Sequence, residues 1–177
     1  PLKALCEQAA EDWWSASLVA IARAAAEAGP GRVAGLAIAH QRESFAALDA
    51  DNRPLRPAML WMDSRGASLL GGLGSRLEGL MGPGGFRAAT GKALSANLSL
   101  SKIDWMRLRE PALFERAALF LDVQAYLALR LCGRAVTGWG SADPTGLFDM
   151  GARRWSESIM ATVGLDAGRL PEAIEPG

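Results

Sequence analysis

The sequence predicts an α/β fold with its strands in the first third of the chain and a helix-rich second half. Two observations carry this prediction. The apolar run VAGLAIA at 33–39 is followed by two more strand-like stretches. After Trp61, amphipathic and glycine-broken helical patterns take over. No repeat or low-complexity linker divides the 177 residues, so we expect one compact domain with a small sheet.

The first predicted element is an amphipathic helix over residues 12–28. Asp12 suits the N-cap position, and Gly29 followed by Pro30 ends the pattern. Apolar residues recur at spacings of three and four, at Trp14, Leu18, Ile21 and Ala25. This spacing indicates that one face of the helix is apolar.

Three strands are predicted next. The run Val33–Ala39 is short, continuously apolar and preceded by Gly31, which is typical of a strand buried on both faces. Residues 44–49 and 58–61 form the second and third strands. The turn residues Asp51–Pro54 lie between them, so we expect a hairpin there.

The remaining elements are mostly helical. In chain order we expect a glycine-interrupted helical region at 63–81, a helix at 99–109 ended by Pro111, a short helix at 112–118, a strand followed by a helix within 118–133, turns and strands at 135–149, and a short helix at 155–163. Four tryptophans in the predicted helices read most simply as packing residues: Trp13, Trp14, Trp105 and Trp155.

Composition excludes several classes of function. The formal net charge is zero and the basic residues are scattered, so we expect neither a nucleic-acid partner nor a membrane-surface patch. We find no apolar stretch of about 18 residues and no signal peptide. Cys6 and Cys132 are isolated and the chain has one histidine, so we expect buried thiols, no metal site and a cytoplasmic location.

Two glycine-containing motifs favour structural roles. GPGRVAG at 29–35 precedes a strand and has the wrong spacing for a dinucleotide-binding turn, so a helix stop and tight turn explain it better. In GWGSADPTG at 138–146, Ser141 has no local histidine or other base to activate it, which favours a plain loop.

The most chemically specific stretch is HQRE, which follows the apolar run. Arg42 supplies a fork of donors and Glu43 supplies acceptors, so together they suit the vicinal hydroxyls of a neutral polyhydroxy molecule. The alternative is a surface ion pair of little energetic consequence. Trp61 ends a strand nearby. Two roles suit an indole there: stacking on the apolar face of a sugar, or packing over the edge of the core.

The order of these pieces resembles the FGGY carbohydrate kinases, a family that includes glycerol kinase and xylulokinase. The matching segments are EQAAEDWW at 7–14, the stretch from VAGLAIA to DSR at 33–65, SLSKIDWM at 99–106, AYLALRLCG at 125–133 and SADPTGLFD at 141–149. Ala9 and Ala10 depart from the Asp and Pro of the family pattern. The resemblance therefore covers nearly the whole chain.

This resemblance implies an actin-like, ribonuclease-H-like ATPase fold, with residues 1–177 forming an incomplete, substrate-side N-terminal domain. The family transfers the γ-phosphoryl group of ATP, with Mg²⁺, to a hydroxyl of a sugar or polyol, here a pentulose such as xylulose or a glycerol-like polyol. The alternative is a non-catalytic actin-like domain that binds a sugar or a protein.

The resemblance also implies parts outside these residues. We expect the phosphate-binding hairpin before residue 1, and the catalytic base and the C-terminal ATP-binding domain beyond residue 177. No catalytic residue is therefore assigned here, and we expect residues 1–177 alone to be inactive. The expected partners are a sugar or polyol and the C-terminal lobe of the same full-length chain, with homodimerisation left open.

The same resemblance assigns substrate-binding residues. Arg42 and Glu43 align with the Arg-Glu pair that holds glycerol in glycerol kinases, and with the Met-His pair that xylulokinases place at the sugar. Trp61 aligns with the tryptophan of the glycerol site. Gln41, beside the pair, is included in the predicted substrate site.

Three further residues complete the predicted site. Asn97 stands near the position of the glycerol-site tyrosine, so it offers an amide instead of an aromatic face. Asp63 and Arg65 belong to the Trp-x-Asp-x-Arg segment, and we expect them to pair and fix the strand end behind the substrate residues.

Overall fold

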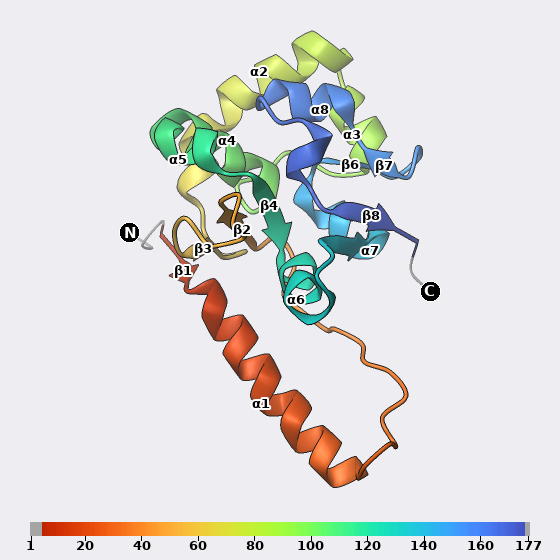
Figure 1. The fold of residues 1–177 in the computed structure, drawn as a ribbon. Coiled ribbons are helices and arrows are strands. Elements are labelled where there is room, and N and C mark those ends of the chain that lie inside the picture. The colour runs from red at the N-terminus through yellow and green to blue at the C-terminus, as the bar shows by residue number, and fades with distance from the viewer. Residues whose placement is uncertain (1–4, 176–177) are drawn as a thin grey trace.

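The computed structural model describes residues 5–175. Figure 1 shows a helix-rich body built around a small sheet. The helices are α1 Ala10–Ala28, α2 Leu70–Met81, α3 Gly85–Thr90, α4 Ser99–Arg109, α5 Pro111–Arg116, α6 Val123–Cys132, α7 Trp139–Ala142 and α8 Glu157–Thr162. The strands are β1 Glu7–Gln8, β2 Phe45–Leu48, β3 Ala58–Met59, β4 Leu119–Asp122, β5 Val136–Gly138, β6 Phe148–Asp149, β7 Arg154–Trp155 and β8 Glu172–Ile174.

The main sheet has the order β1-β3-β2-β4, and its neighbours are all antiparallel. The predicted hairpin joins β2 to β3, and the carboxylate of Asp49 accepts hydrogen bonds from the backbone N–H groups of Asp51 and Arg53 within the turn. Two smaller sheets pair β5 with β8 in parallel and β6 with β7 antiparallel. The α/β class and the helix-rich second half predicted from the sequence are confirmed.

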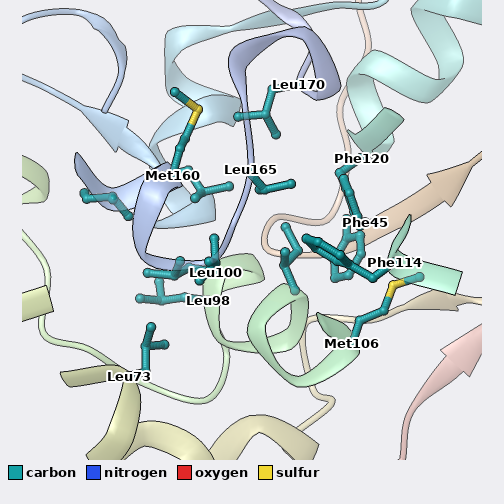
Figure 2. Close-up of a cluster of buried hydrophobic side chains, with 14 of the residues drawn as sticks. Phe45, Leu73, Leu98, Leu100, Met106, Phe114, Phe120, Met160, Leu165 and Leu170 are labelled. Atoms are coloured by element: carbon teal, nitrogen blue, oxygen red, sulfur yellow. The ribbon is translucent and has the colours of Figure 1, made fainter. Parts of the chain in front are cut away.

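Strand β2 carries the core on both of its faces. Because successive side chains of a strand point to opposite faces, Phe45 and Ala47 face one hydrophobic cluster, whereas Ala46 and Leu48 face another. The first cluster lies under α2, α4, α5 and α8, and Figure 2 shows Phe45 and Phe120 within it. The second packs against the start of α1 and against α6. Helices therefore cover both faces of the sheet.

The predicted strand Val33–Ala39 is wrong, because these residues have no regular secondary structure. Val33 and Leu36 are more than half exposed. A strand requires a neighbour whose backbone groups pair with its own. Among residues 5–175 no strand pairs with this run, so its apolar composition alone does not make it a strand.

Helix α1 also differs from the prediction. It begins at Ala10, with Ala9 instead of Asp12 in the N-cap position, and it ends before Gly29 as expected. Only Ala10 and Trp13 of the helix are buried. Figure 1 shows its second half running away from the sheet, with the 29–44 segment returning beside it. The apolar face of α1 is therefore largely uncovered in the described part of the chain.

The later helices agree more closely with the sequence. Helix α4 spans 99–109 as predicted, and Pro111 opens α5 directly after it. The prediction that Trp155 lies in a helix is wrong, because this residue belongs to β7. Helix α8 begins only at Glu157, with the side chain of Ser156 as its N-cap. Among residues 5–175, none of the helices has the length and apolar character to cross a membrane.

One close approach fixes α4 against the chain that follows β3. A Cβ atom at Gly66 would lie 2.7 Å from the carbonyl oxygen of Ser101, whereas one at Gly79 in α2 would meet nothing within 4 Å. We therefore expect Gly66→Ala to lower the free energy of unfolding by about 1–3 kcal/mol through overpacking.

The matched control is Gly79→Ala, which we expect to raise the free energy of unfolding by roughly 0.5–1 kcal/mol because alanine favours a helix. Urea unfolding of the two variants measures both values. Equal effects at the two positions would contradict the close approach.

Candidate functional site

The candidate site lies where two strand ends share one edge of the main sheet. Phe45, the first residue of β2, pairs with Met59, the last residue of β3. The segment Gln41–Ser44 before β2 and the residues Leu60 and Trp61 after β3 therefore meet, and we call these residues the strand-end site. The backbone N–H of Trp61 donates to the Ser44 hydroxyl oxygen at 2.9 Å, which joins the two segments directly.

Lys102 of α4 lies beneath the strand-end site and is fully buried. Its ammonium group donates to the carbonyl oxygen of Glu43 at 2.6 Å and to that of Leu60 at 3.1 Å. Burial lowers the pKa of Lys102 to about 8, although the nearby carboxylates of Asp63 and Glu43 favour its charged form. One buried side chain thus holds both halves of the site.

Glu43 has an unusual backbone. Its φ is +59°, in the left-handed region that residues with a Cβ seldom occupy. The hydroxyl of Ser99, at the start of α4, donates to the Glu43 carbonyl oxygen at 3.0 Å, beside the Lys102 contact. This carbonyl therefore accepts two hydrogen bonds from one turn of a single helix.

The predicted substrate residues lie in, or close in sequence to, the segments that make these contacts. The Arg42 side chain is 60% exposed and lies 3.6 Å from the Glu43 carboxylate, which is 21% exposed. The Trp61 side chain is exposed, so its indole is accessible at the strand end. Asn97 is exposed and precedes Ser99 by two residues, and Gln41 is half-buried. Donors, acceptors and an aromatic face thus lie around one strand end.

Asp63 and Arg65 pair as the sequence predicted. Arg65 donates to both carboxylate oxygens of Asp63, at 2.8 and 2.6 Å, and the backbone N–H of Cys6 donates to the same carboxylate at 2.8 Å. Burial favours a higher pKa for Asp63, but the hydrogen bonds from Arg65 and Cys6 outweigh it and hold this pKa below its ordinary value.

The pair continues into a wider network. Arg65 donates to Glu7 at 2.5 Å, and its guanidinium lies 4.7 Å from the ring centre of Trp105 in α4. Arg56 bridges Glu7 and Glu110. The chain leaving β3 is therefore anchored to β1 and to α4 immediately behind Trp61.

Ser141 has a partner that its local sequence does not reveal. The sequence places no histidine near it, but His40 Nε2 lies 2.8 Å from its hydroxyl oxygen, and His40 Nδ1 lies 2.9 Å from the carbonyl oxygen of Gln41. The fold brings together two residues that are far apart in sequence. The contact ties the start of the strand-end site to α7.

The strand-end site presents hydrogen-bonding and aromatic side chains. Within residues 5–175, no group of three or more His, Cys, Asp and Glu side chains is arranged to hold an ion. Arginine donors, carboxylate acceptors and an indole face are the groups that recognise a neutral polyhydroxy molecule.

Sequence reasoning did not identify the residues that support the site. Ser44, Ser99 and Lys102 are all buried, and their partners are backbone atoms of distant segments. The available signal was a lysine within the apolar face of a predicted helix. A buried lysine requires acceptors, and here they are main-chain carbonyl oxygens.

Comparison with known proteins identifies related chains. Residues 1–177 match the FGGY family of carbohydrate kinases, N-terminal domain. The chain is 37% identical over 182 residues to the glycerol kinase of Thermus brockianus, covering 97% of this chain and 36% of that protein. It is 33% identical over 166 residues to the xylulose kinase of Streptomyces rubiginosus, covering 93% of this chain and 33% of that protein.

The fold is likewise similar to solved structures. The crystal structure of a xyloylose kinase from Brucella ovis superposes with a TM-score of 0.87 at 30% identity, covering 99% of this chain and 36% of that one. The chain thus spans about a third of the length of these relatives.

The lowered pKa of Lys102 predicts a pH-dependent stability. Between the folded value of about 8 and the ordinary value of 10.5, the unfolded chain binds more protons, so stability rises with pH in this window. Relative to Lys102→Met, the parent chain should gain roughly 2 kcal/mol in free energy of unfolding between about pH 7.5 and 9.5. Urea unfolding at several pH values measures this, and a constant difference between the two proteins would contradict it.

Proposed function

Because the chain belongs to the FGGY family of carbohydrate kinases, as its N-terminal domain, we propose that it provides the substrate-binding wall of a sugar or polyol kinase. The complete protein would transfer the γ-phosphoryl group of ATP to a substrate hydroxyl. The observation that carries the proposal is the strand-end site, where Arg42, Glu43 and Trp61 lie around two joined strand ends.

Each side chain has a distinct role in this proposal. Arg42 donates to substrate hydroxyl oxygens, and Glu43 accepts from substrate hydroxyl groups. Their exposure leaves both able to reach a ligand. Trp61 packs against the apolar face of the carbon chain or ring. Gln41 and Asn97 add amide contacts, and the buried pair Asp63–Arg65 fixes the chain behind Trp61.

The substrate is proposed to be a pentulose such as xylulose or a glycerol-like polyol. Xylulose kinases and glycerol kinases both match this chain over more than nine tenths of its length. Asn97 is exposed two residues before Ser99, and its amide would offer hydrogen bonds to a substrate with additional hydroxyl groups.

ATP and Mg²⁺ are proposed to bind mainly to other parts of the complete protein. Mg²⁺ is usually held by one or two carboxylates together with substrate phosphates. We propose that a C-terminal lobe supplies these groups and closes over the strand-end site, which would exclude water from the reaction. The described residues position the acceptor.

The proposal is tested in the complete gene product with ATP, Mg²⁺ and a panel of ketoses and polyols. Each of Arg42→Ala and Glu43→Ala should raise KM for the best substrate about 10–100-fold, because each removes charged hydrogen bonds worth roughly 1.5–3 kcal/mol. Steady-state kinetics measures the change.

The matched control is Arg53→Ala in the β2–β3 turn. Arg53 also pairs with a nearby acidic residue, Asp51, at 3.3 Å, but both are largely exposed and outside the strand-end site. We expect its KM to equal that of the parent protein. Absence of phosphorylation across the panel would refute the kinase proposal, and would favour a non-catalytic binding domain. Unchanged KM in both site variants would refute the assignment of the site.

A further inference from the structure

We propose that Ser99 and Lys102 are positioning residues that aim the Glu43 carboxylate at the substrate. This inference rests on the proposed function, since it concerns the same strand-end site. The two residues do not touch the substrate themselves. They act on the Glu43 backbone by donating to its carbonyl oxygen, at 3.0 Å from Ser99 and 2.6 Å from Lys102.

The first argument is the strain in the Glu43 backbone. A left-handed conformation in a residue with a Cβ costs about 1–2 kcal/mol and persists only where the surroundings impose it. The φ of Glu43 is +59°. Two hydrogen bonds to its carbonyl oxygen fix the peptide plane that follows Glu43. Because the Cα atom of Glu43 lies in that plane, the point from which its side chain starts is fixed as well.

The second argument is the position of the two donors. Ser99 and Lys102 are three residues apart, so they lie on the same face of α4 within one turn. Both side chains are buried. Burying an ammonium group is unfavourable because it loses its hydration, and an apolar side chain would fill the same space without this loss. The presence of a lysine here therefore indicates that its hydrogen bonds matter. The contacts in question are with the two strand ends that carry Glu43 and Trp61.

The third argument is that α4 is a rigid reference. Leu100, Ile103 and Met106 anchor it in the core, where at most 1% of each is exposed. Asp104, also buried, pairs with Arg76 and Arg107. Because α4 is fixed on these sides, the hydrogen bonds from Ser99 and Lys102 hold Glu43 in a fixed position relative to the core. The site is thereby preorganised before substrate arrives.

The central variant is Ser99→Ala in the complete gene product. It removes one donor and little volume, and should raise KM about five-fold, the factor that corresponds to roughly 1 kcal/mol. We expect kcat within two-fold of the parent value, because Glu43 contributes to substrate binding. Ser99→Thr retains the hydroxyl and should restore the parent KM.

A double-mutant cycle separates positioning from general destabilisation. If Ser99 acts through Glu43, Ser99→Ala should have no further effect on KM in a Glu43→Ala background. The structural control is Thr162→Val in α8, which removes a buried hydroxyl that donates to the Ser158 carbonyl oxygen at 2.9 Å. It should lower the melting temperature comparably and leave KM unchanged.

Lys102→Met tests the second donor and should raise KM more than Ser99→Ala, because contacts to both strand ends are lost. If this variant does not fold, the Ser99 series decides alone. Two results would overturn the positioning role: an equal effect of Ser99→Ala on KM with and without the Glu43 side chain, or a rise in KM for Thr162→Val equal to that for Ser99→Ala. The proposed function would still stand in either case if the parent protein phosphorylates a substrate. A parent protein without phosphorylation activity would overturn both.

Discussion

The ammonium group of Lys102 is the contact on which the geometry of the strand-end site depends. It joins the carbonyl oxygens of Glu43 and Leu60, so the chain before β2 and the chain after β3 keep a fixed separation. Since its partners are backbone atoms, the contact specifies where the side chains of Glu43 and Trp61 begin. It does not depend on what those side chains are. The same support therefore suits different side chains at positions 43 and 61.

The N-terminal part of the chain shows what happens without such a constraint. Helix α1 is anchored mainly at its start, through Trp13 against Tyr126, and the 33–39 run has no partner strand in the described part of the chain. Apolar side chains on both segments stay exposed. By contrast, the site is built on β2 and β3, which are buried, and on the buried face of α4. It extends into the 41–44 segment where Lys102 and Ser99 hold the Glu43 carbonyl oxygen.

The sequence predicted the elements whose signals are local. The hairpin turn at 51–54 and the helix at 99–109 follow from turn chemistry and apolar spacing, and the structure contains both. The strand predicted at 33–39 is absent because a strand forms only beside a neighbouring strand, which composition does not reveal. The His40–Ser141 contact and the acceptors of Lys102 are long-range, so no local pattern announces them. The pairing of Asp63 with Arg65 was predictable because the two residues are only two positions apart in the chain.

We propose that one strand end, supported by Lys102, binds substrate hydroxyls. The most direct measurement is a crystal structure of the complete gene product with the sugar or polyol that it phosphorylates. We predict substrate hydroxyls within about 3.2 Å of the Arg42 and Glu43 side chains. We also predict Trp61 against the carbon skeleton and Lys102 still bonded to both carbonyl oxygens. Substrate bound elsewhere, with Arg42 and Glu43 facing only solvent, would contradict the assignment of the strand-end site.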